Sequence, residues 1–150
     1  MPLSSNPCAD WSCRLFVAER TEYIIMSNTP SMYSCVMPSK DIAGIDFFLS
    51  NLLSTMAEFM KSDEQNENYE RFIAPTAANV VFAKSLNRSV TESMSNHVHG
   101  SKLYLSDGLY SHEIGLQLNN TRLPALTDSQ GHHYAKPREV FTRLARTLQS

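Results

Sequence analysis

The first forty residues constrain the fold most strongly, because three short apolar runs follow one another there at turn-sized intervals. The runs contain residues typical of strands and occupy positions 15–17, 23–26 and 32–37. The links at 19–21 and 28–31 are too short for a crossover, so neighbouring strands must run antiparallel. Pro38 has no backbone N–H and ends the third strand. The chain is therefore expected to begin with a three-stranded antiparallel meander.

A long amphipathic helix is predicted next. Asp41 is suited to cap its N-terminus. Apolar residues then recur at helical spacing, at Ile45, Phe48, Leu49, Leu52, Leu53, Met56, Phe59 and Met60. Residues 62–68 are acidic and rich in amides, without an apolar side chain, and this composition predicts a solvent-exposed loop that ends the helix.

The middle of the chain is expected to supply two more strands and a second long helix. Short apolar runs at 70–74 and 80–84 indicate strands. The helix should begin within 85–89 and continue to about Leu105, since apolar residues follow one of its sides.

Two further helices are predicted in the C-terminal third. The first is short and covers residues 111–118, and an irregular segment with Pro124 and Gly131 follows it. Pro137 is suited to the first turn of the last helix. The apolar side of that helix consists of Val140, Phe141, Leu144 and Leu148.

Together these elements predict an α+β domain. A mainly antiparallel sheet of about five strands, starting with the N-terminal three-strand meander, should pack against two long helices and a C-terminal helix. Residues 1–11 are rich in proline, serine and asparagine and are expected to form a flexible tail unless they dock on the domain. Residues 12–150 are then expected to form a single domain, which is large enough to fold without disulfide bonds or a structural metal ion.

The composition narrows the possible functions. Thirteen basic and fifteen acidic residues give a formal net charge of -2, so the chain has no overall field that would attract nucleic acid or an anionic membrane. Its longest strongly apolar stretch, 42–60, is interrupted by polar residues, which argues against a membrane span. Those residues are Asp46, Asn51 and Glu58.

The cysteines and the N-terminus predict a cytoplasmic protein. Cys8, Cys13 and Cys35 cannot all pair within one chain, and none lies in a CxxC motif, so a reducing compartment is the simplest interpretation. Residues 1–10 lack the basic and apolar regions of a secretory signal.

Three strings resemble a family of small uncharacterised bacterial proteins that is known only as a domain of unknown function. They are RLFVAERTE at 14–22, NRSVTESMSN at 87–96, which resembles a family string close to NRSVxGSMN, and KPREVF at 136–141. In the middle string Glu92 stands where the family commonly has glycine. The resemblance covers most of residues 13–148 and implies a fold and a compartment, but no established activity.

The string Asn87–Arg88–Ser89 is one candidate site. It lies at a predicted helix start, where backbone N–H groups and the helix dipole favour the binding of an anion. The guanidinium of Arg88 would add a bidentate hydrogen-bond donor. A small phosphate or carboxylate site, serving a small-molecule or phosphoester enzyme, would fit there. In the structural alternative, Ser89 caps the helix and Arg88 pairs with Glu92 one turn later.

The basic residues near the C-terminus form a second candidate site. Arg138, Arg143 and Arg146 on the last helix, together with Arg122, would suit a nucleic-acid accessory factor. Such a helix is more often a solvated face whose cations complement its C-terminal dipole, and the slightly acidic chain also disfavours nucleic acid as a partner.

The histidines and cysteines predict neither a metal site nor a cofactor. His97 and His99 are two positions apart on a helix and therefore point about 200° apart, too far to share one ion. Cys13 and Cys35 are interpreted as buried small apolar residues, because no neighbouring base would activate either thiol.

The leading functional hypothesis is therefore a non-catalytic binding or interaction module of unknown ligand. Self-association through an exposed sheet edge or apolar patch would make it a homo-oligomer. Catalysis around Arg88 and nucleic-acid binding by the C-terminal helix stay open as alternatives.

Overall fold

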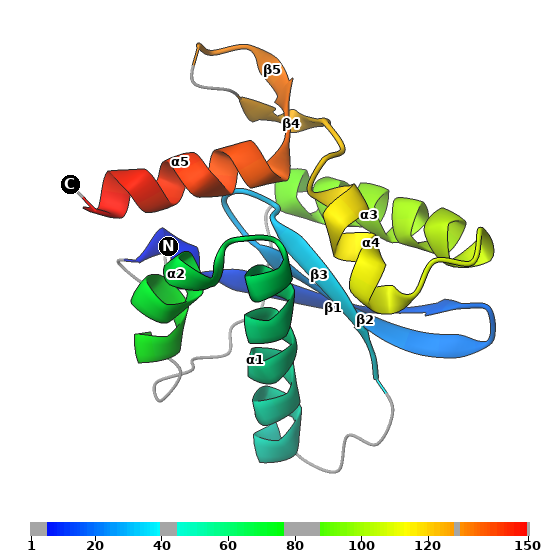
Figure 1. Cartoon of the computed structure of the whole chain (residues 1–150). Coiled ribbons are helices and arrows are strands. Elements are labelled where there is room, and N and C mark those ends of the chain that lie inside the picture. The colour runs from blue at the N-terminus through cyan, green and yellow to red at the C-terminus, as the bar shows by residue number, and fades with distance from the viewer. Residues whose placement is uncertain (1–5, 40–44, 77–87, 128–129, 150) are drawn as a thin grey trace.

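The computed structural model describes residues 6–39, 45–76, 88–127 and 130–149. A three-stranded sheet lies at its centre, surrounded by helices, and a small second sheet projects from one end (Figure 1). The strands are β1 (Trp11–Ala18), β2 (Thr21–Asn28), β3 (Ser34–Pro38), β4 (Leu123–Thr127) and β5 (His133–Ala135). The main helices are α1 (Ile45–Ser62), α3 (Arg88–Ser106), α4 (Ser111–Leu118) and α5 (Pro137–Gln149).

The predicted antiparallel meander is confirmed, with strand order β1-β2-β3. Ala18 pairs with Thr21, so β1 and β2 are joined by the two residues Glu19 and Arg20. Both of these have positive φ, +49° and +63°. A two-residue turn of this kind matches the right-handed twist of the strands that it joins.

The buried side chain of Asn28 organises the second turn and the N-terminal segment. Its Oδ1 accepts hydrogen bonds from the Ser31 N–H and hydroxyl, and its Nδ2 donates to the carbonyls of Pro7 and Asp10. The short 3-10 turn η1 (Pro7–Ala9) places Cys8 in the core. Residues 6–11 are therefore packed against the sheet, although the composition of 1–11 alone suggested a flexible tail.

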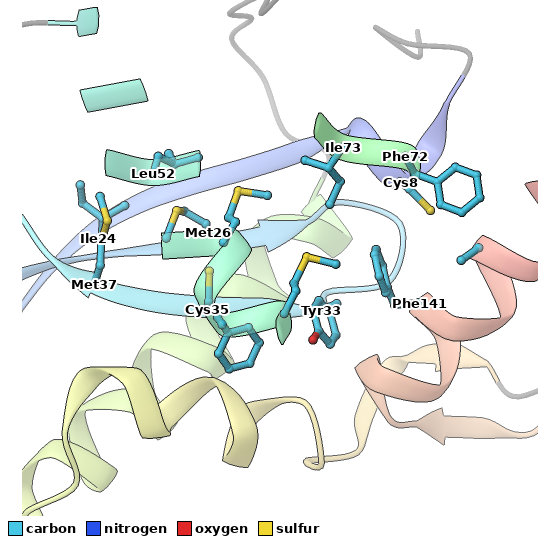
Figure 2. Close-up of a cluster of buried hydrophobic side chains, with 14 residues drawn as sticks. Cys8, Ile24, Met26, Tyr33, Cys35, Met37, Leu52, Phe72, Ile73 and Phe141 are labelled. Carbon is cyan, nitrogen blue, oxygen red and sulfur yellow. The ribbon is translucent and has the colours of Figure 1, made fainter. Parts of the chain in front are cut away.

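The sheet separates two apolar clusters, because alternate residues of its middle strand point to opposite faces. Ile24 and Met26 face the α1 side, and Figure 2 shows them with Met37 and Leu52 in that cluster. Ile25 faces the other cluster, which contains residues of α3, α4, α5 and β4. Burial on both faces accounts for the continuous apolar run that predicted β2.

The predicted strand at 70–74 is wrong. Residues 70–74 are helical, within η2 (Tyr69–Ile73) and η3 (Ala74–Thr76), where Phe72 and Ile73 are buried. The 80–84 strand lies outside the described residues. The segment predicted to be irregular instead forms the β4–β5 hairpin, so the mixed α+β class holds while the strands divide into sheets of three and two.

The helices follow the sequence predictions more closely. The segment whose apolar residues recur at helical spacing forms α1. Asp41, its predicted N-cap, lies outside the described residues. The described part of the second long helix begins at Arg88. The short helix occupies 111–118 and the last one opens at Pro137, both as predicted.

A short helix, α2 (Asn66–Asn68), lies within the segment predicted to be an exposed loop at 62–68. That prediction is wrong for two of its residues. The Gln65 side chain is buried, and the Asp63 side chain is only 7% exposed. Both are directed towards α5, where they form polar contacts.

Candidate functional site

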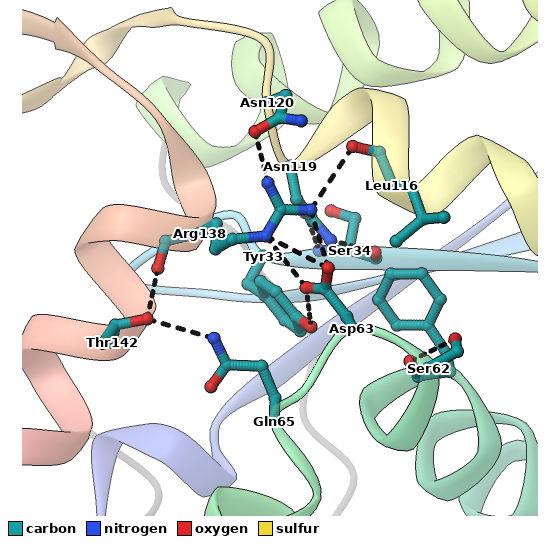
Figure 3. A network of polar contacts seen from close by, with 11 residues as sticks. Tyr33, Ser34, Ser62, Asp63, Gln65, Leu116, Asn119, Asn120, Arg138 and Thr142 are labelled. Atoms are coloured by element: carbon teal, nitrogen blue, oxygen red, sulfur yellow. Dashed lines mark hydrogen bonds and ion pairs between the residues drawn. The ribbon is translucent and has the colours of Figure 1, made fainter.

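An ion pair between Asp63 and Arg138 is the centre of a polar network between α1, α4 and α5 (Figure 3). The Arg138 Nε donates to both carboxylate oxygens at 3.1 Å, and Nη2 donates to Oδ1 at 2.8 Å. The buried Tyr33 hydroxyl donates to Oδ2 at 2.6 Å. This arrangement satisfies the carboxylate with a guanidinium and a phenol from distant parts of the chain.

Further contacts join the same network to the end of α4 and the start of α5. Arg138 also donates to the Asn120 side chain and, at 3.5 Å, to the carbonyl of Leu116. The Gln65 amide donates to the Thr142 hydroxyl at 3.1 Å. The Arg138 guanidinium thus has protein acceptors on several sides, so its chemistry is that of a structural clamp and not of a ligand site.

Burial and the neighbouring Asp63 carboxylate both raise the pKa of Tyr33 far above its ordinary value. Its hydroxyl therefore stays protonated and acts as a donor. Its ring stacks on Phe141, with centroids 4.6 Å apart. Tyr33 is thus a core residue with one satisfied polar atom.

The predicted anion-site residues are only partly brought together. Asn87 lies outside the described residues. Arg88 is exposed over 92% of its side chain and its Nε lies 3.1 Å from Glu92 Oε1, as the structural alternative predicts. Ser89 instead lines an open hollow of about 240 Å³ with Val90 and Ser93, and Arg88 does not line it.

None of the described residues that line this hollow has a charged side chain. It lies between the β2–β3 turn, the start of α3 and β4, and its other lining residues are Thr29, Pro30, Met32, Ala125 and Leu126. An anion would find hydroxyl groups there but no cationic partner from the residues that form it.

Three of the four predicted nucleic-acid residues bond to groups within the fold. Arg138 is the clamp residue and is only 25% exposed. Arg143 donates to the Thr127 carbonyl at 2.8 Å, and Arg122 donates to the Tyr134 carbonyl at 3.2 Å. Both therefore brace the β4–β5 hairpin, while Arg146 is exposed further along α5. The sequence analysis grouped these arginines as one basic site, because their hydrogen-bond partners elsewhere in the fold have no local signal in the sequence.

His97 is a buried core histidine. Its Nε2 lies 3.0 Å from the carbonyl of Met32 in the β2–β3 turn. Desolvation lowers its pKa to about 4, partly offset by this hydrogen bond. His99, two positions later, is exposed. Among the described residues, no three His, Cys, Asp or Glu side chains gather as a metal site would require.

All three cysteines are free thiols. Cys8 and Cys35 are buried, and burial raises the pKa of Cys8 to about 11 and that of Cys35 further. Cys13 is exposed on β1, which corrects its interpretation as a buried residue. It was misplaced because alternation in a strand fixes which residues share a face but not whether that face is covered.

The two outer edges of the three-stranded sheet differ. At β3, the side chain of Asn119, the C-cap residue of α4, accepts from Ser34 N at 2.7 Å and donates to Ser34 O at 3.0 Å, so it pairs with Ser34 as one residue of a neighbouring strand would. At β1, the only strand partner within the described chain is β2. Within the described residues, β1 is therefore the outer strand without a second partner.

The backbone groups at this edge can be assigned. The pair that flanks a two-residue hairpin turn exchanges both hydrogen bonds, so Ala18 and alternate residues before it bond to β2. Ser39 N donates to Glu22 O, which independently places the even residues of β2 towards β3. The N–H and C=O groups of Cys13, Leu15 and Val17 consequently point outward.

The side chains of these outward residues share one face and are exposed. Leu15 and Val17 are each 59% exposed, and Cys13 is exposed beside them. The only charged residue of β1 is Arg14, whose Nη1 donates to Ser95 Oγ of α3 on the other face. An apolar, uncharged strip thus follows a free sheet edge.

A family model described as Domain of unknown function (DUF6933) matches residues 1–140. The chain belongs to this family. Comparison with curated proteins and with solved structures finds no match for it.

The strings that carried the resemblance can now be placed in this DUF6933 fold. RLFVAERTE contains most of β1, the following turn and the first residues of β2. The described part of NRSVTESMSN forms the first half of α3, and KPREVF contains the start of α5 with the clamp residue Arg138. In the described portion of the DUF6933 chain, no helix is both long and apolar enough to cross a membrane.

Proposed function

We propose that this DUF6933 protein is a non-catalytic interaction module that binds an extended segment along the outer edge of β1. The observation that carries the proposal is the contrast between the two edges of the sheet: α4 covers β3 through Asn119, and β1 has no second strand partner in the described chain. A bare edge with outward N–H and C=O groups is a template for a further strand.

The side chains beside the edge support the same proposal. Soluble proteins commonly protect a free edge strand with a lysine, a proline or a bulge. Here β1 pairs with β2 in continuous register, contains neither residue, and exposes Leu15 and Val17. Backbone bonds would supply affinity for the incoming segment, and the apolar strip would select its side chains.

The catalytic and nucleic-acid alternatives have less support. Arg88 makes a local ion pair on the surface, and the described residues that line the hollow near Ser89 are uncharged. Of the arginines of the second hypothesis, Arg138 pairs with Asp63, and Arg122 and Arg143 donate to carbonyls of the β4–β5 hairpin. A cytoplasmic location belongs to the proposal as well, supported by three free thiols.

A peptide titration tests the proposal. The probe is a synthetic peptide with the sequence of residues 10–20 and serine at its cysteine position, added to isotope-labelled protein. Amide signals of Cys13, Leu15 and Val17 should shift most, because these N–H groups point to the edge. A Leu15→Arg variant should bind the peptide more weakly, since it charges the apolar strip. Shifts confined to other elements, or none at millimolar peptide, would refute strand addition at β1.

A further inference from the structure

We infer that the hollow between the β2–β3 turn, the start of α3 and β4 binds a small neutral molecule with one aromatic ring and one hydrogen-bonding group, in the chemical class of the phenols. The inference goes beyond the proposed function, because the hollow lies on the α3 side of the sheet and the apolar strip of β1 lies on the α1 side. Either site can exist without the other.

One buried hydroxyl in the wall of the hollow has no protein partner. Ser93 is 4% exposed, and its hydroxyl makes no hydrogen bond to the residues that the structure describes. In the same part of the chain, every fully enclosed side-chain nitrogen or oxygen does have a partner. The Ser93 oxygen must therefore reach open space, and the hollow that Ser93 lines is that space. A bound molecule can supply the hydrogen bond that this hydroxyl lacks.

The hydroxyl groups of Thr29 and Ser89 in the same wall are in a different state. Thr29 Oγ1 lies 2.7 Å from the Ser12 hydroxyl, so it already has a partner. Ser89 is exposed, so water can bond to it. Among the described lining residues, Ser93 thus offers the one buried hydroxyl that is unpaired, and a hydroxyl can both donate and accept. The ligand therefore needs a single hydrogen-bonding group at its inner end.

The other described residues of the wall are mostly apolar, and all are uncharged. Met32 and Leu126 are 2% and 5% exposed and form the inner wall with Ser93. Pro30 and Ala125 are exposed at the mouth. A charged molecule would lose its hydration here without an opposite charge in return, so the ligand should be neutral. The thioether of Met32 favours an aromatic ring, because contacts between sulfur and aromatic rings are stabilising.

The volume of the hollow sets the size of the ligand. It encloses about 240 Å³. An apolar cavity of about 150 Å³ is large enough to bind benzene. Drug-sized ligands occupy pockets of about 300–1,000 Å³. A single ring with a substituent therefore fits the hollow best.

Hydrogen bonds hold the turn side of the hollow in place. Met32 N donates to Asn28 O at 2.7 Å, and Met32 O lies 3.0 Å from His97 Nε2. Thr29 N donates to Asp10 O at 2.8 Å. These bonds fix Met32 in a left-handed backbone conformation, with φ +60°. The wall is thus formed before a ligand binds, as in most small-molecule sites.

Titration with phenol tests the site. The methionine methyl groups of the protein are isotope-labelled, and their signals are followed as phenol is added. The Met32 signal should shift in a saturable way, because the ring of the probe lies against it. Met37 and Met56 belong to the cluster on the other face of the sheet and should not shift. Benzoate, which has the same ring with a charge, should leave Met32 unchanged.

The variant Ser93→Ala tests the predicted hydrogen bond. Phenol should bind to it roughly fivefold more weakly than to the wild type. Toluene has the size of phenol without the hydrogen-bonding group, so both proteins should bind it equally. The variant should fold, because the hydroxyl has no partner in the described chain and alanine favours a helix.

Ser101→Ala is the matched control on the same helix. Ser101 is also buried, but its hydroxyl donates to His97 O and it does not line the hollow. Its affinity for phenol should equal that of the wild type. A second variant, Ala125→Trp, fills the hollow from an exposed position and should abolish the shift of the Met32 signal.

The outcomes that would overturn the inference are distinct from failure at β1. Absence of a saturable Met32 shift with phenol would overturn it, as would equal phenol affinity in the wild type and Ser93→Ala. Equal losses of phenol and toluene binding in that variant would mean that Ser93 shapes the wall and does not bond to the ligand. The peptide titration at β1 uses another probe and other signals, so its result imitates none of these.

Discussion

At the scale of single residues, Arg138 shows what a sequence pattern misses. Its place with Arg143 and Arg146 on the last helix suggests a basic stripe, but its guanidinium forms an ion pair with Asp63, seventy-five positions earlier in the chain. The loop that contains Asp63 looked solvent-exposed because it has no apolar residue. Long-range pairs of this kind have no local signal, so neither partner was predictable alone.

The clamp should matter for stability. Arg138→Met removes the partner of an almost buried carboxylate, and we expect a loss of about 3 kcal/mol in the free energy of unfolding. Arg88→Met is the matched control, since it removes an exposed pair with Glu92 that contributes below about 0.5 kcal/mol. Urea unfolding of both variants measures the difference. Equal losses would mean that the Asp63–Arg138 pair does not stabilise the fold.

His97 predicts a dependence of stability on pH. Its pKa in the folded chain, about 4, is lower than the 6.5 of an unfolded histidine, so the unfolded state takes up the proton first as the pH falls. The contribution of His97 should be complete above pH 6.5, decline between 6.5 and 4, and then level off, with a total change of about 3 kcal/mol.

A His97→Gln variant retains a donor for the Met32 carbonyl but does not titrate in this range. Its unfolding free energy should therefore fall less than that of the wild type between pH 7 and pH 4. His99→Gln is the control, because His99 is exposed. If the wild type and both variants have parallel pH profiles, His97 is not a buried neutral group.

At the scale of elements, the helices of the C-terminal third were predictable, whereas the short strands β4 and β5 were not. Pro137 fixed the start of α5, and the short helix predicted at 111–118 has the same bounds as α4. The run at 70–74 was too short for its periodicity to decide between strand and helix. The β4–β5 hairpin was hidden by Pro124 in β4 and by the left-handed backbone of Tyr134, at φ +67°.

The packing of α4 against the sheet depends on Gly115. A Cβ atom there would lie 2.5 Å from a carbon of the Phe59 ring and 2.9 Å from the Ser34 carbonyl oxygen, which is backbone and cannot easily move. Gly115→Ala should therefore lower the free energy of unfolding by about 2 kcal/mol.

Gly100 in α3 provides a matched control for this prediction. A Cβ there would meet Leu118 at 3.5 Å, an ordinary contact, so Gly100→Ala should raise stability by up to about 1 kcal/mol through helix propensity. Thermal unfolding of the two variants should shift in opposite directions. A shift in the same direction would show that close approach of α4 does not decide the effect.

At the scale of the whole molecule, the sequence predicted the α+β class and the order of the meander, and it suggested an exposed sheet edge as a route to self-association. It did not identify which edge. That depends on Asn119, whose side chain bonds to Ser34 of β3 from eighty-five positions away, and this pairing has no local signal in the sequence. The anion and nucleic-acid hypotheses depended on local patterns, and their arginines are engaged in separate contacts within the fold.

Residue-resolved amide hydrogen exchange in β1 of the dilute wild type tests the central claim most directly. The N–H groups of Arg14 and Phe16 bond to β2 and should exchange slowly. Those of Cys13, Leu15 and Val17 should exchange much faster, and should become protected when the 10–20 peptide is added. If these three amides exchange as slowly as Arg14 and Phe16 without the peptide, the chain covers its own edge and the proposed interaction site does not exist.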